Sequence, residues 1–200
     1  HYLDTDLEEN SDELRGITNR LYGGGVDLRI KQELVLGVGG IRALRALDIH
    51  PTLFHLNEGH SSFLVLERAR EYIIQNGGDL WGAIEALRPS NAFTTHTPVE
   101  AGHDRFSPDL AYRHLAWWAH EVGIDGYQLL DLGRWPGNED PNAAFNMTLL
   151  AMKFSEKLNG VAALHGEVSR QMFARYWPNL TPEEVPISHV TNGVHAPSWQ

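Results

Sequence analysis

The sequence has no cysteine, no long hydrophobic run and few cations for its length. Without cysteine there can be no disulfide framework, thiol nucleophile or thiolate metal ligand. The longest apolar run, residues 34–41, contains three glycines and is well short of the roughly 18 residues of a membrane span, so no membrane partner is expected. Sixteen Lys and Arg stand against 26 Asp and Glu, a net charge of −10. Binding to nucleic-acid phosphates needs clustered cations, so a nucleic-acid partner is not expected either.

The remaining composition is that of an ordinary globular protein. Of 200 residues, 42% are hydrophobic and 10% are aromatic, which is enough to bury a core. This composition favours a cytoplasmic protein that acts on a neutral or polar ligand. The sequence begins at His1 with neither an initiator Met nor a signal segment, so we expect it to be part of a longer protein.

Hydrophobic periodicity predicts helices that alternate with short strands. The predicted helices span 27–48, 61–75, 80–87, 109–122, 147–158 and 167–176, the predicted strands span 52–57, 92–95 and 187–191, and a short extended piece spans 160–164. Residues 1–25 and 133–142 are predicted loops. Strands separated by helices are typical of βαβ units. The predicted fold class is therefore α/β, with a Rossmann-like parallel sheet covered by helices on both faces.

Polar side chains follow each predicted strand. They are Asn57, Glu58 and His60 after the first strand, His96 and Thr97 after the second, His165 near the third, and Asn192 after the last. Ligands of open α/β sheets bind at the carboxyl ends of the strands. Amides, imidazoles and hydroxyls pair well with the hydroxyl groups of a sugar, whereas a phosphate pocket would need Lys or Arg. The alternative is that Asn57 and Thr97 only cap helices and that Asn192 belongs to a turn.

Several other motifs are set aside. The glycines of 37–40 lie inside a helical pattern without a preceding strand, so close helix packing explains them better than a dinucleotide loop. The histidine spacings do not match a helical zinc site, and His165-Gly-Glu167 lacks the cysteines of a zinc deaminase, so no metal is expected. Trp117, Trp118 and Tyr112 could stack on a sugar, but aromatic residues at helical spacing are more often core.

Carboxylates leave a second enzymatic interpretation open. Glu58, Glu100 and Asp104 could supply the carboxyl pair of a glycoside hydrolase, whose chemistry depends on their separation in space. A third interpretation is a domain that binds carbohydrate, or forms an interface, without catalysis.

The motifs taken together resemble the α-glucan phosphorylases, the family of glycogen, maltodextrin and starch phosphorylases. They are Tyr22-Gly-Gly, Leu28-Arg-Ile-Lys-Gln-Glu33, His55-Leu-Asn-Glu-Gly-His60, Thr94-Thr-His-Thr97, Ala101-Gly-His-Asp104, Asn159-Gly-Val-Ala162, Leu164-His-Gly-Glu167 and Thr191-Asn-Gly193. The order and spacing of the motifs extend over the whole chain, and they are most similar to the shorter bacterial and archaeal branch.

The resemblance implies a two-domain GT-B fold, of which residues 1–200 form part of the amino-terminal Rossmann-like domain, with a gate-like loop region at 1–26. It also implies the reversible phosphorolysis of α-1,4-glucan at its non-reducing end by inorganic phosphate, which gives α-glucose 1-phosphate. Pyridoxal phosphate assists that reaction and is bound by a lysine of the carboxyl-terminal domain. That lysine is absent from this chain, so we expect no cofactor-binding residue and no turnover here. A homo-oligomer is possible.

The resemblance also implies roles for single residues. His96 corresponds to the catalytic histidine that contacts the 6-hydroxyl of the reacting glucosyl unit, and Asn192 corresponds to its partner on that hydroxyl. The other substrate-binding positions that we expect are Asn57, Glu58, His60, Thr97, Asp104, Val161 and, in the gate-like loop, Asp6. Glu100 departs from the short branch, which usually has proline there. Lys31, Lys153 and Lys157 do not lie in matching motifs.

Overall fold

The computed structural model describes residues 2–21 and 24–199 and has an α/β fold built on a parallel sheet. The strands are β1 (Phe54–Asn57), β2 (Asn91–Thr94), β5 (Lys157–Gly160) and β6 (Ile187–His189), and they lie in the order β1-β2-β5-β6. All three strand pairs are parallel. The predicted fold class is confirmed. Tyr22 and Gly23, from the first family motif, lie outside the described residues.

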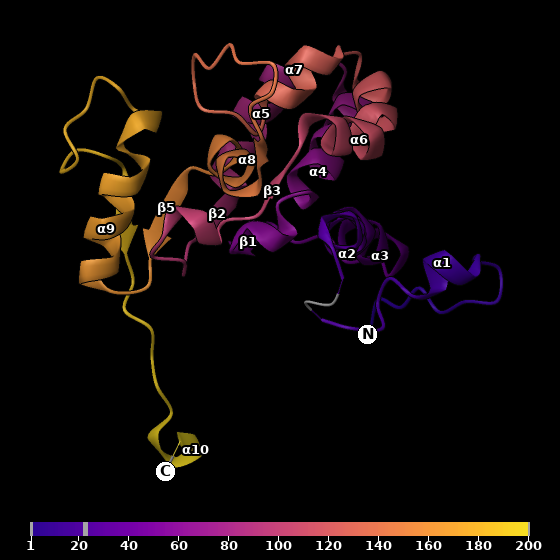
Figure 1. Ribbon diagram of the computed structural model, residues 1–200, viewed down its shortest axis with the longest axis horizontal. Coiled ribbons are helices and arrows are strands. Elements are labelled where there is room, and N and C mark those ends of the chain that lie inside the picture. The colour runs from indigo at the N-terminus through magenta and orange to yellow at the C-terminus, as the bar shows by residue number, and fades with distance from the viewer. Residues whose placement is uncertain (1, 22–23, 200) are drawn as a thin grey trace.

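Helices connect the strands and precede the sheet (Figure 1). They are α1 (Asp12–Arg15), α2 (Val26–Leu34), the π-helical turn η1 (Val35–Gly39), α3 (Gly40–Ala46), α4 (Leu64–Asn76), α5 (Leu80–Leu87), α6 (Pro108–Val122), α7 (Gly126–Asp131), α8 (Met147–Phe154), α9 (Ala163–Phe173) and α10 (Ala196–Trp199). Short 3-10 turns are η2 (Gly59–Ser61), η3 (Arg88–Ser90), η4 (Glu100–Gly102) and η5 (Ala174–Tyr176). A small antiparallel pair joins β3 (Arg105–Phe106) to β4 (Phe145–Asn146).

The two faces of the parallel sheet differ. Leu56, Phe93, Leu158 and Ile187 are in register across the four strands, and all four are buried against the helices. On the opposite face, His55, Asn57, Lys157 and Ser188 are exposed in the described part of the chain. Because the strand order advances by one position at each step, right-handed crossovers place the connecting helices on one face. This one-sided covering differs from the two-sided covering that the sequence predicted.

Two sequence interpretations about packing are confirmed. A Cβ atom at Gly37 would lie 2.7 Å from the backbone nitrogen of Leu64, so the glycine permits close contact between η1 and the start of α4. It forms no dinucleotide loop. The Trp118 ring is fully buried, and its Nε1 donates to the carbonyl of Leu66 at 2.8 Å, so it belongs to the core. Trp117 and Tyr112 lie at the surface instead.

The prediction is wrong at the end of α8. The helix stops at Phe154, and residues 157–160 form β5, although the pattern predicted helix to 158 and an extended piece at 160–164. The Asn91 amide donates to the carbonyl of Phe154 at 2.7 Å, and the backbone N–H of Glu156 bonds the carbonyls of Arg88 and Asn91. These long-range bonds tie the segment to the start of β2, and local periodicity contains no signal for them.

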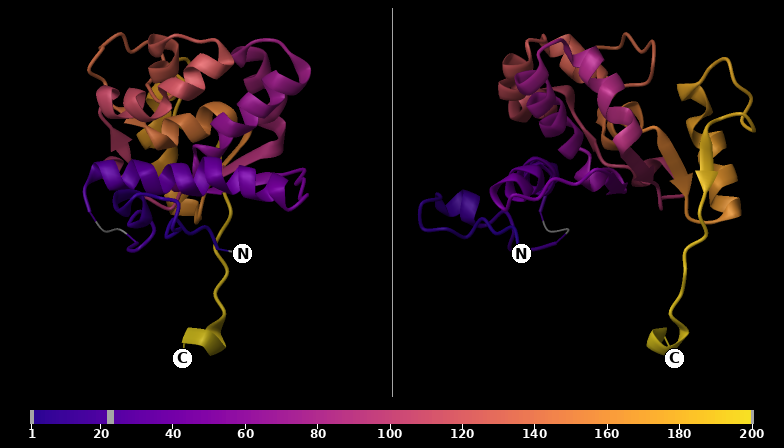
Figure 2. Two further views of the ribbon diagram at one scale, coloured as in Figure 1. Left: turned by 90° about the vertical axis from the view of Figure 1, so that its right-hand side faces the viewer. Right: turned by 180° about the vertical axis from the view of Figure 1, so that it is seen from behind.

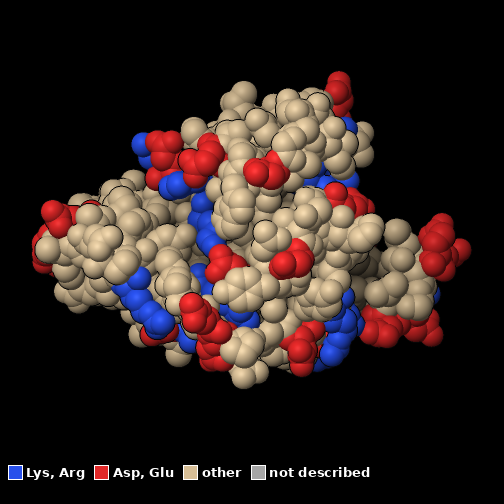
Figure 3. Space-filling view, turned by 90° about the horizontal axis from the view of Figure 1, so that it is seen from above, with Lys and Arg blue, Asp and Glu red and all other residues tan. Residues whose placement is uncertain are grey.

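The termini lie apart from the sheet. Residues 2–21, which carry α1, lie beside α2 and α3, and residues 190–199 extend away from the rest of the chain to α10 (Figures 1 and 2). Acidic and basic side chains alternate on the face seen in Figure 3. Among the described residues, the helices are all too short or too polar to span a membrane.

Candidate functional site

The predicted site residues gather at the carboxyl edge of the sheet. Asn57 ends β1 and is followed by Glu58, whose N–H donates to the carbonyl of Thr94 at 2.9 Å. His96 and Thr97 follow β2, and Val161 follows β5. The backbone N–H of Asn192 donates to the carbonyl of Val161 at 3.0 Å, which brings the last segment to the same edge. Neighbouring parallel strands therefore present these residues side by side.

Glu58 fastens the loop that carries His96. Its carboxylate is buried, and Oε1 accepts hydrogen bonds from the backbone N–H groups of His96 and Thr97, the latter at 2.7 Å. The Thr95 hydroxyl donates to the same oxygen at 3.4 Å. A carboxylate that binds the protein's own backbone in this way holds the loop. The substrate-binding role that the resemblance implies for Glu58 stays a prediction.

The backbone of Glu58 is itself unusual. Its φ is 65° and its ψ is 179°, a region that is essentially restricted to glycine. The conformation turns the chain at the end of β1 so that the Glu58 side chain reaches the end of β2. Strained residues of this kind cluster at functional sites, where the surrounding contacts hold them in place.

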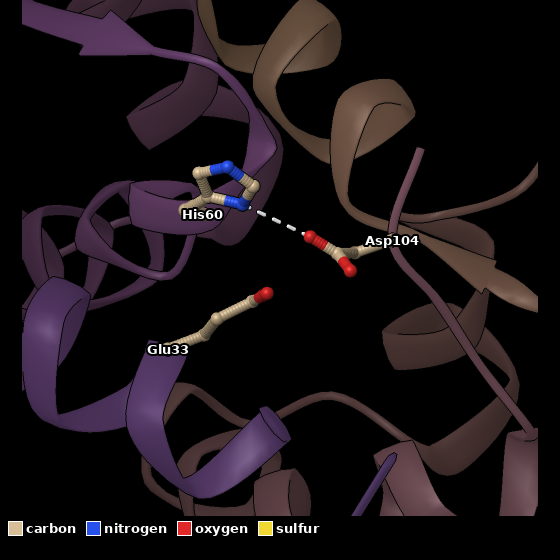
Figure 4. Close-up of side chains that lie close together, drawn as sticks. All are labelled: Glu33, His60 and Asp104. Atoms are coloured by element: carbon tan, nitrogen blue, oxygen red, sulfur yellow. Dashed lines mark hydrogen bonds and ion pairs between the residues drawn. The ribbon is translucent and has the colours of Figure 1, made fainter. Parts of the chain in front are cut away.

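A second cluster joins α2, η2 and the loop before β3 (Figure 4). His60 Nδ1 lies 2.9 Å from Asp104 Oδ2, and Arg29 Nη2 lies 2.9 Å from the same oxygen and 2.6 Å from His60 Nδ1. Arg29 Nε also pairs with Glu33 Oε1 at 2.9 Å, one helical turn further along α2. The structure thus brings together two predicted residues, His60 and Asp104, with two that the site prediction did not include.

The two carboxyl groups of this cluster have opposite pKa shifts. Burial, together with the neighbouring Asp104 carboxylate, raises the pKa of Glu33 to about 9, and Arg29 only partly offsets this. Burial would also raise the pKa of Asp104, but hydrogen bonds from His60, Arg29 and Glu33 outweigh it and hold that pKa well below its usual range. Both shifts favour a charged Asp104 and a neutral Glu33.

The cluster has the donor types of a metal site but is filled by a guanidinium. Oxygen atoms of Glu33 and Asp104 and a ring nitrogen of His60 lie within 4.8 Å of one another. Arg29 Nη2 lies within hydrogen-bond distance of both His60 and Asp104, so the cation between these side chains is the Arg29 guanidinium. A metal ion here would have to displace that charge.

Two cavities meet at this cluster, and Arg29 and His60 line both. One, of about 380 Å³, is also lined by Val26, Gly102 and Asp104, and Gly102 lies directly against the Thr97 side chain. The other, of about 330 Å³, lies between the amino-terminal segment and α2 and contacts Glu33.

Other predicted residues lie elsewhere. Asp6 is exposed and pairs with Arg15 of α1 at 2.6 Å, within the amino-terminal segment. The Asn192 side chain is exposed. His165 lies in α9 near the end of β5, where its Nδ1 accepts from the N–H of Val161 at 3.3 Å. Glu100 is exposed and pairs with Arg105 at 3.0 Å.

The site prediction missed Arg29, Glu33 and His103. Arg29 and Glu33 stand four residues apart in a predicted helix, a spacing that favours an ion pair but does not show what faces it. His103 is buried and shares a hydrogen bond with the Thr148 hydroxyl at 2.9 Å, and burial lowers its pKa. The sequence contained no signal for that contact.

The three lysines of the chain all pair with acidic residues. Lys31 pairs with Asp27 and Glu13, Lys153 binds Asp131, and Lys157 pairs with Glu156. These are all the lysines of the sequence, and none lines the strand edge or either cavity of the described structure.

Comparisons with known proteins agree with the motifs. A glycogen phosphorylase of Mycobacterium tuberculosis is 44% identical over 208 residues, which cover 98% of this chain and 24% of that protein. A maltodextrin phosphorylase of Thermococcus litoralis is 40% identical over 100% of this chain and 23% of its own length. A glycogen phosphorylase of Aquifex aeolicus is 38% identical over 100% of this chain and 28% of its own length. No protein-family model matches. The chain spans about a quarter of the length of these relatives.

Proposed function

We propose that the full-length protein phosphorolyses α-1,4-glucans, because this chain belongs to the glycogen and maltodextrin phosphorylase family over the segment it spans. The reaction would transfer the terminal glucosyl unit to inorganic phosphate and release α-glucose 1-phosphate. In this proposal the chain supplies part of the glucosyl-binding edge of the amino-terminal GT-B domain.

The observation that carries the proposal is the anchored His96 loop. Glu58 binds two consecutive backbone N–H groups of this loop, so the positions of His96 and Thr97 are set before any sugar binds. His96 is partly exposed and can offer its imidazole to a sugar hydroxyl, with Asn192 on the neighbouring segment as its partner. Positioning of this kind lowers the cost of ordering the reacting groups.

The other predicted substrate positions fit around this loop. Asn57 and Val161 lie at the ends of the flanking strands, and His60 and Asp104 face the cavity next to Thr97. We assign the last two to the acceptor side of the site. Asp6 stays a prediction, as it pairs with Arg15 here.

The hydrolase interpretation has less support from the geometry. The Glu58 carboxylate is bound to backbone N–H groups, and Glu100 is paired with Arg105. The carboxyl groups that do lie close together are those of Glu33 and Asp104, and Glu33 is only 2% exposed. A buried acid that is shielded by Arg29 cannot reach a glycosidic bond.

Parts of the proposal lie outside this chain. The pyridoxal phosphate, its lysine and the phosphate-binding residues would belong to a carboxyl-terminal domain, which would also close the cleft over the strand edge. A cytoplasmic location and assembly into a homo-oligomer stay predictions.

The test is phosphorolysis of maltodextrin by the full-length protein and its variants. His96→Ala should lower kcat/KM by on the order of 100-fold, as loss of a group that stabilises the transition state does, and Asn192→Ala should lower it by about tenfold. His120→Ala, on the exposed side of α6, should leave it unchanged. A His96→Ala variant with full activity would contradict the proposal.

A further inference from the structure

Glu33 is a buried acid whose carboxyl group points toward Asp104 and His60 (Figure 4). It is 2% exposed, and its oxygen lies within 4.8 Å of the Asp104 oxygen and the His60 ring nitrogen. One guanidinium, that of Arg29, serves both carboxyl groups. Two carboxylates next to one partly buried guanidinium leave a negative charge uncompensated, a state that the burial of Glu33 strongly disfavours.

The contacts show which carboxyl group keeps its charge. Asp104 Oδ2 is 2.9 Å from both Arg29 and His60, and its side chain is 25% exposed to the cavity. Among the described residues, Glu33 has one ion-pair contact, with Arg29 Nε at 2.9 Å, and its side chain is almost fully shielded from solvent. The proton of the pair is therefore expected on Glu33, where it can form a hydrogen bond to Asp104.

We propose that Glu33 is a positioning residue, which stays protonated at neutral pH and holds the charged Asp104 against His60 and toward the cavity beside Thr97. Glu33 itself touches no sugar. Its effect on substrate passes through Asp104 and His60, so this part of the inference rests on the proposed function.

In the described part of the chain, Glu33 faces three charged or titratable groups. Arg29 lies one turn earlier in α2, His60 lies in η2, and Asp104 precedes β3. Arg20 also lines the cavity that Glu33 contacts. The raised pKa of Glu33 agrees with this set, because burial and Asp104 both favour its neutral form.

The first test needs no activity. In the 200-residue chain, a ¹³C NMR titration of the Glu33 carboxyl carbon, assigned through Glu33→Gln, should show a midpoint above pH 7. Buried Glu67, between Arg42 and Arg70, is the matched control, and its midpoint should lie below 4.5, because the hydrogen bonds from Arg70 and Arg42 outweigh its burial. A Glu33 midpoint near 4.5 would overturn the proposal, whatever reaction the full-length protein carries out.

The second test uses phosphorolysis by the full-length protein at pH 7. Glu33→Gln keeps a hydrogen-bond donor of the same size and should change KM for maltodextrin less than twofold, whereas Glu33→Leu removes the donor and should raise KM about tenfold with a smaller change in kcat. Above pH 8 the wild-type KM should rise, and Glu33→Gln should not share that rise. Equal effects of the Gln and Leu variants, or identical alkaline profiles, would overturn the positioning role. If the full-length protein does not phosphorolyse glucan at all, the proposed function fails while the titration still decides where the proton lies.

Discussion

At the scale of single residues, Glu58 combines a backbone conformation that suits glycine with a carboxylate that links the end of β1 to the loop after β2. Its φ of 65° is unfavourable for a residue with a Cβ atom, and the hydrogen bonds to His96 and Thr97 offset the cost. Glu58 therefore has an unfavourable backbone conformation and a side chain that holds the His96 loop in place.

Substitutions at Glu58 separate these two effects. Glu58→Ala leaves two backbone N–H groups without their acceptor and should lower the free energy of unfolding by about 1–3 kcal/mol. Glu58→Gly loses the same acceptor but relieves the strain, so it should be about 1 kcal/mol more stable than the alanine variant. Urea denaturation of the chain measures both. Equal free energies of unfolding for the two variants would show that the backbone at Glu58 is not strained.

The pH dependence of stability follows from Glu33. A folded-state pKa of about 9, against an ordinary value of 4.5, means that unfolding releases a proton between these values. The stabilising contribution of Glu33 is thus complete below pH 4.5 and is lost as the pH rises toward 9, at no more than about 1.4 kcal/mol per pH unit. The Glu33→Gln variant has no carboxyl group to titrate here, so it should not lose this stability as the pH rises. Thermal denaturation should therefore show that the Tm of Glu33→Gln increases relative to that of the wild type from pH 5 to pH 8.

Glu67→Gln is the matched comparison for that experiment. The pKa of Glu67 is lowered, so its contribution is present above pH 4.5 and is lost only in acid. The substitution removes the partner of Arg42 and Arg70 and should destabilise the chain at pH 7 by about 2–3 kcal/mol. Parallel pH profiles for the two glutamine variants would contradict the opposite protonation of these two buried acids.

At the scale of elements, the contact between η1 and α4 depends on glycine at one position and not at a neighbouring one. A Cβ at Gly37 would lie under 3.0 Å from the backbone of Phe63 and Leu64, whereas a Cβ at Gly40 would meet nothing within 4 Å. Gly37→Ala should therefore cost about 1–3 kcal/mol, and Gly40→Ala should stabilise by up to about 1 kcal/mol. Chemical denaturation compares the two variants, and a stabilising Gly37→Ala would contradict the close contact between η1 and α4.

The sequence predicted the elements whose signal is local. The helix over 80–87 agrees with α5, and the strand over 52–57 contains β1, because hydrophobic period and flanking turns identify both. It did not predict β5, whose residues become a strand by pairing with β2, nor the antiparallel pair of β3 and β4. Two-residue strands leave no recognisable period.

The same division applies to the site. Strand ends were sufficient to group His96 with Glu58, because parallel strands end at a common edge. They could not show that Glu58 faces backbone N–H groups, or that Arg29 and Glu33 reach Asp104 from a helix 71 or more residues away in the sequence. Those contacts depend on how α2 packs, which no pattern within α2 records.

At the scale of the whole molecule, one face of the parallel sheet is uncovered in the described part of the chain. His55, Asn57, Lys157 and Ser188 are exposed on that face. On the same face, His55 Nε2 bonds the Thr94 hydroxyl at 2.7 Å, and this hydroxyl donates to Asn159 at 2.9 Å. These polar side chains have hydrogen-bond partners and are stable in contact with water. A polar, uncovered sheet face is consistent with a chain that spans about a quarter of its relatives' length.

The paired lysines give a prediction for the chain alone. Since Lys31, Lys153 and Lys157 are all bound to acidic partners and lie away from the strand edge, the 200-residue chain should form no stoichiometric Schiff base with pyridoxal phosphate and should not turn over glucan. Absorbance spectroscopy checks this. A saturating Schiff-base band, abolished by replacing one of these lysines, would contradict it.

The most direct test of the account is the identity of the product that the full-length protein releases from maltodextrin. With inorganic phosphate present, we expect α-glucose 1-phosphate, observed by ³¹P and ¹H NMR, and no sugar release when phosphate is withheld. Release of glucose or maltose without phosphate would contradict it and would favour a hydrolase.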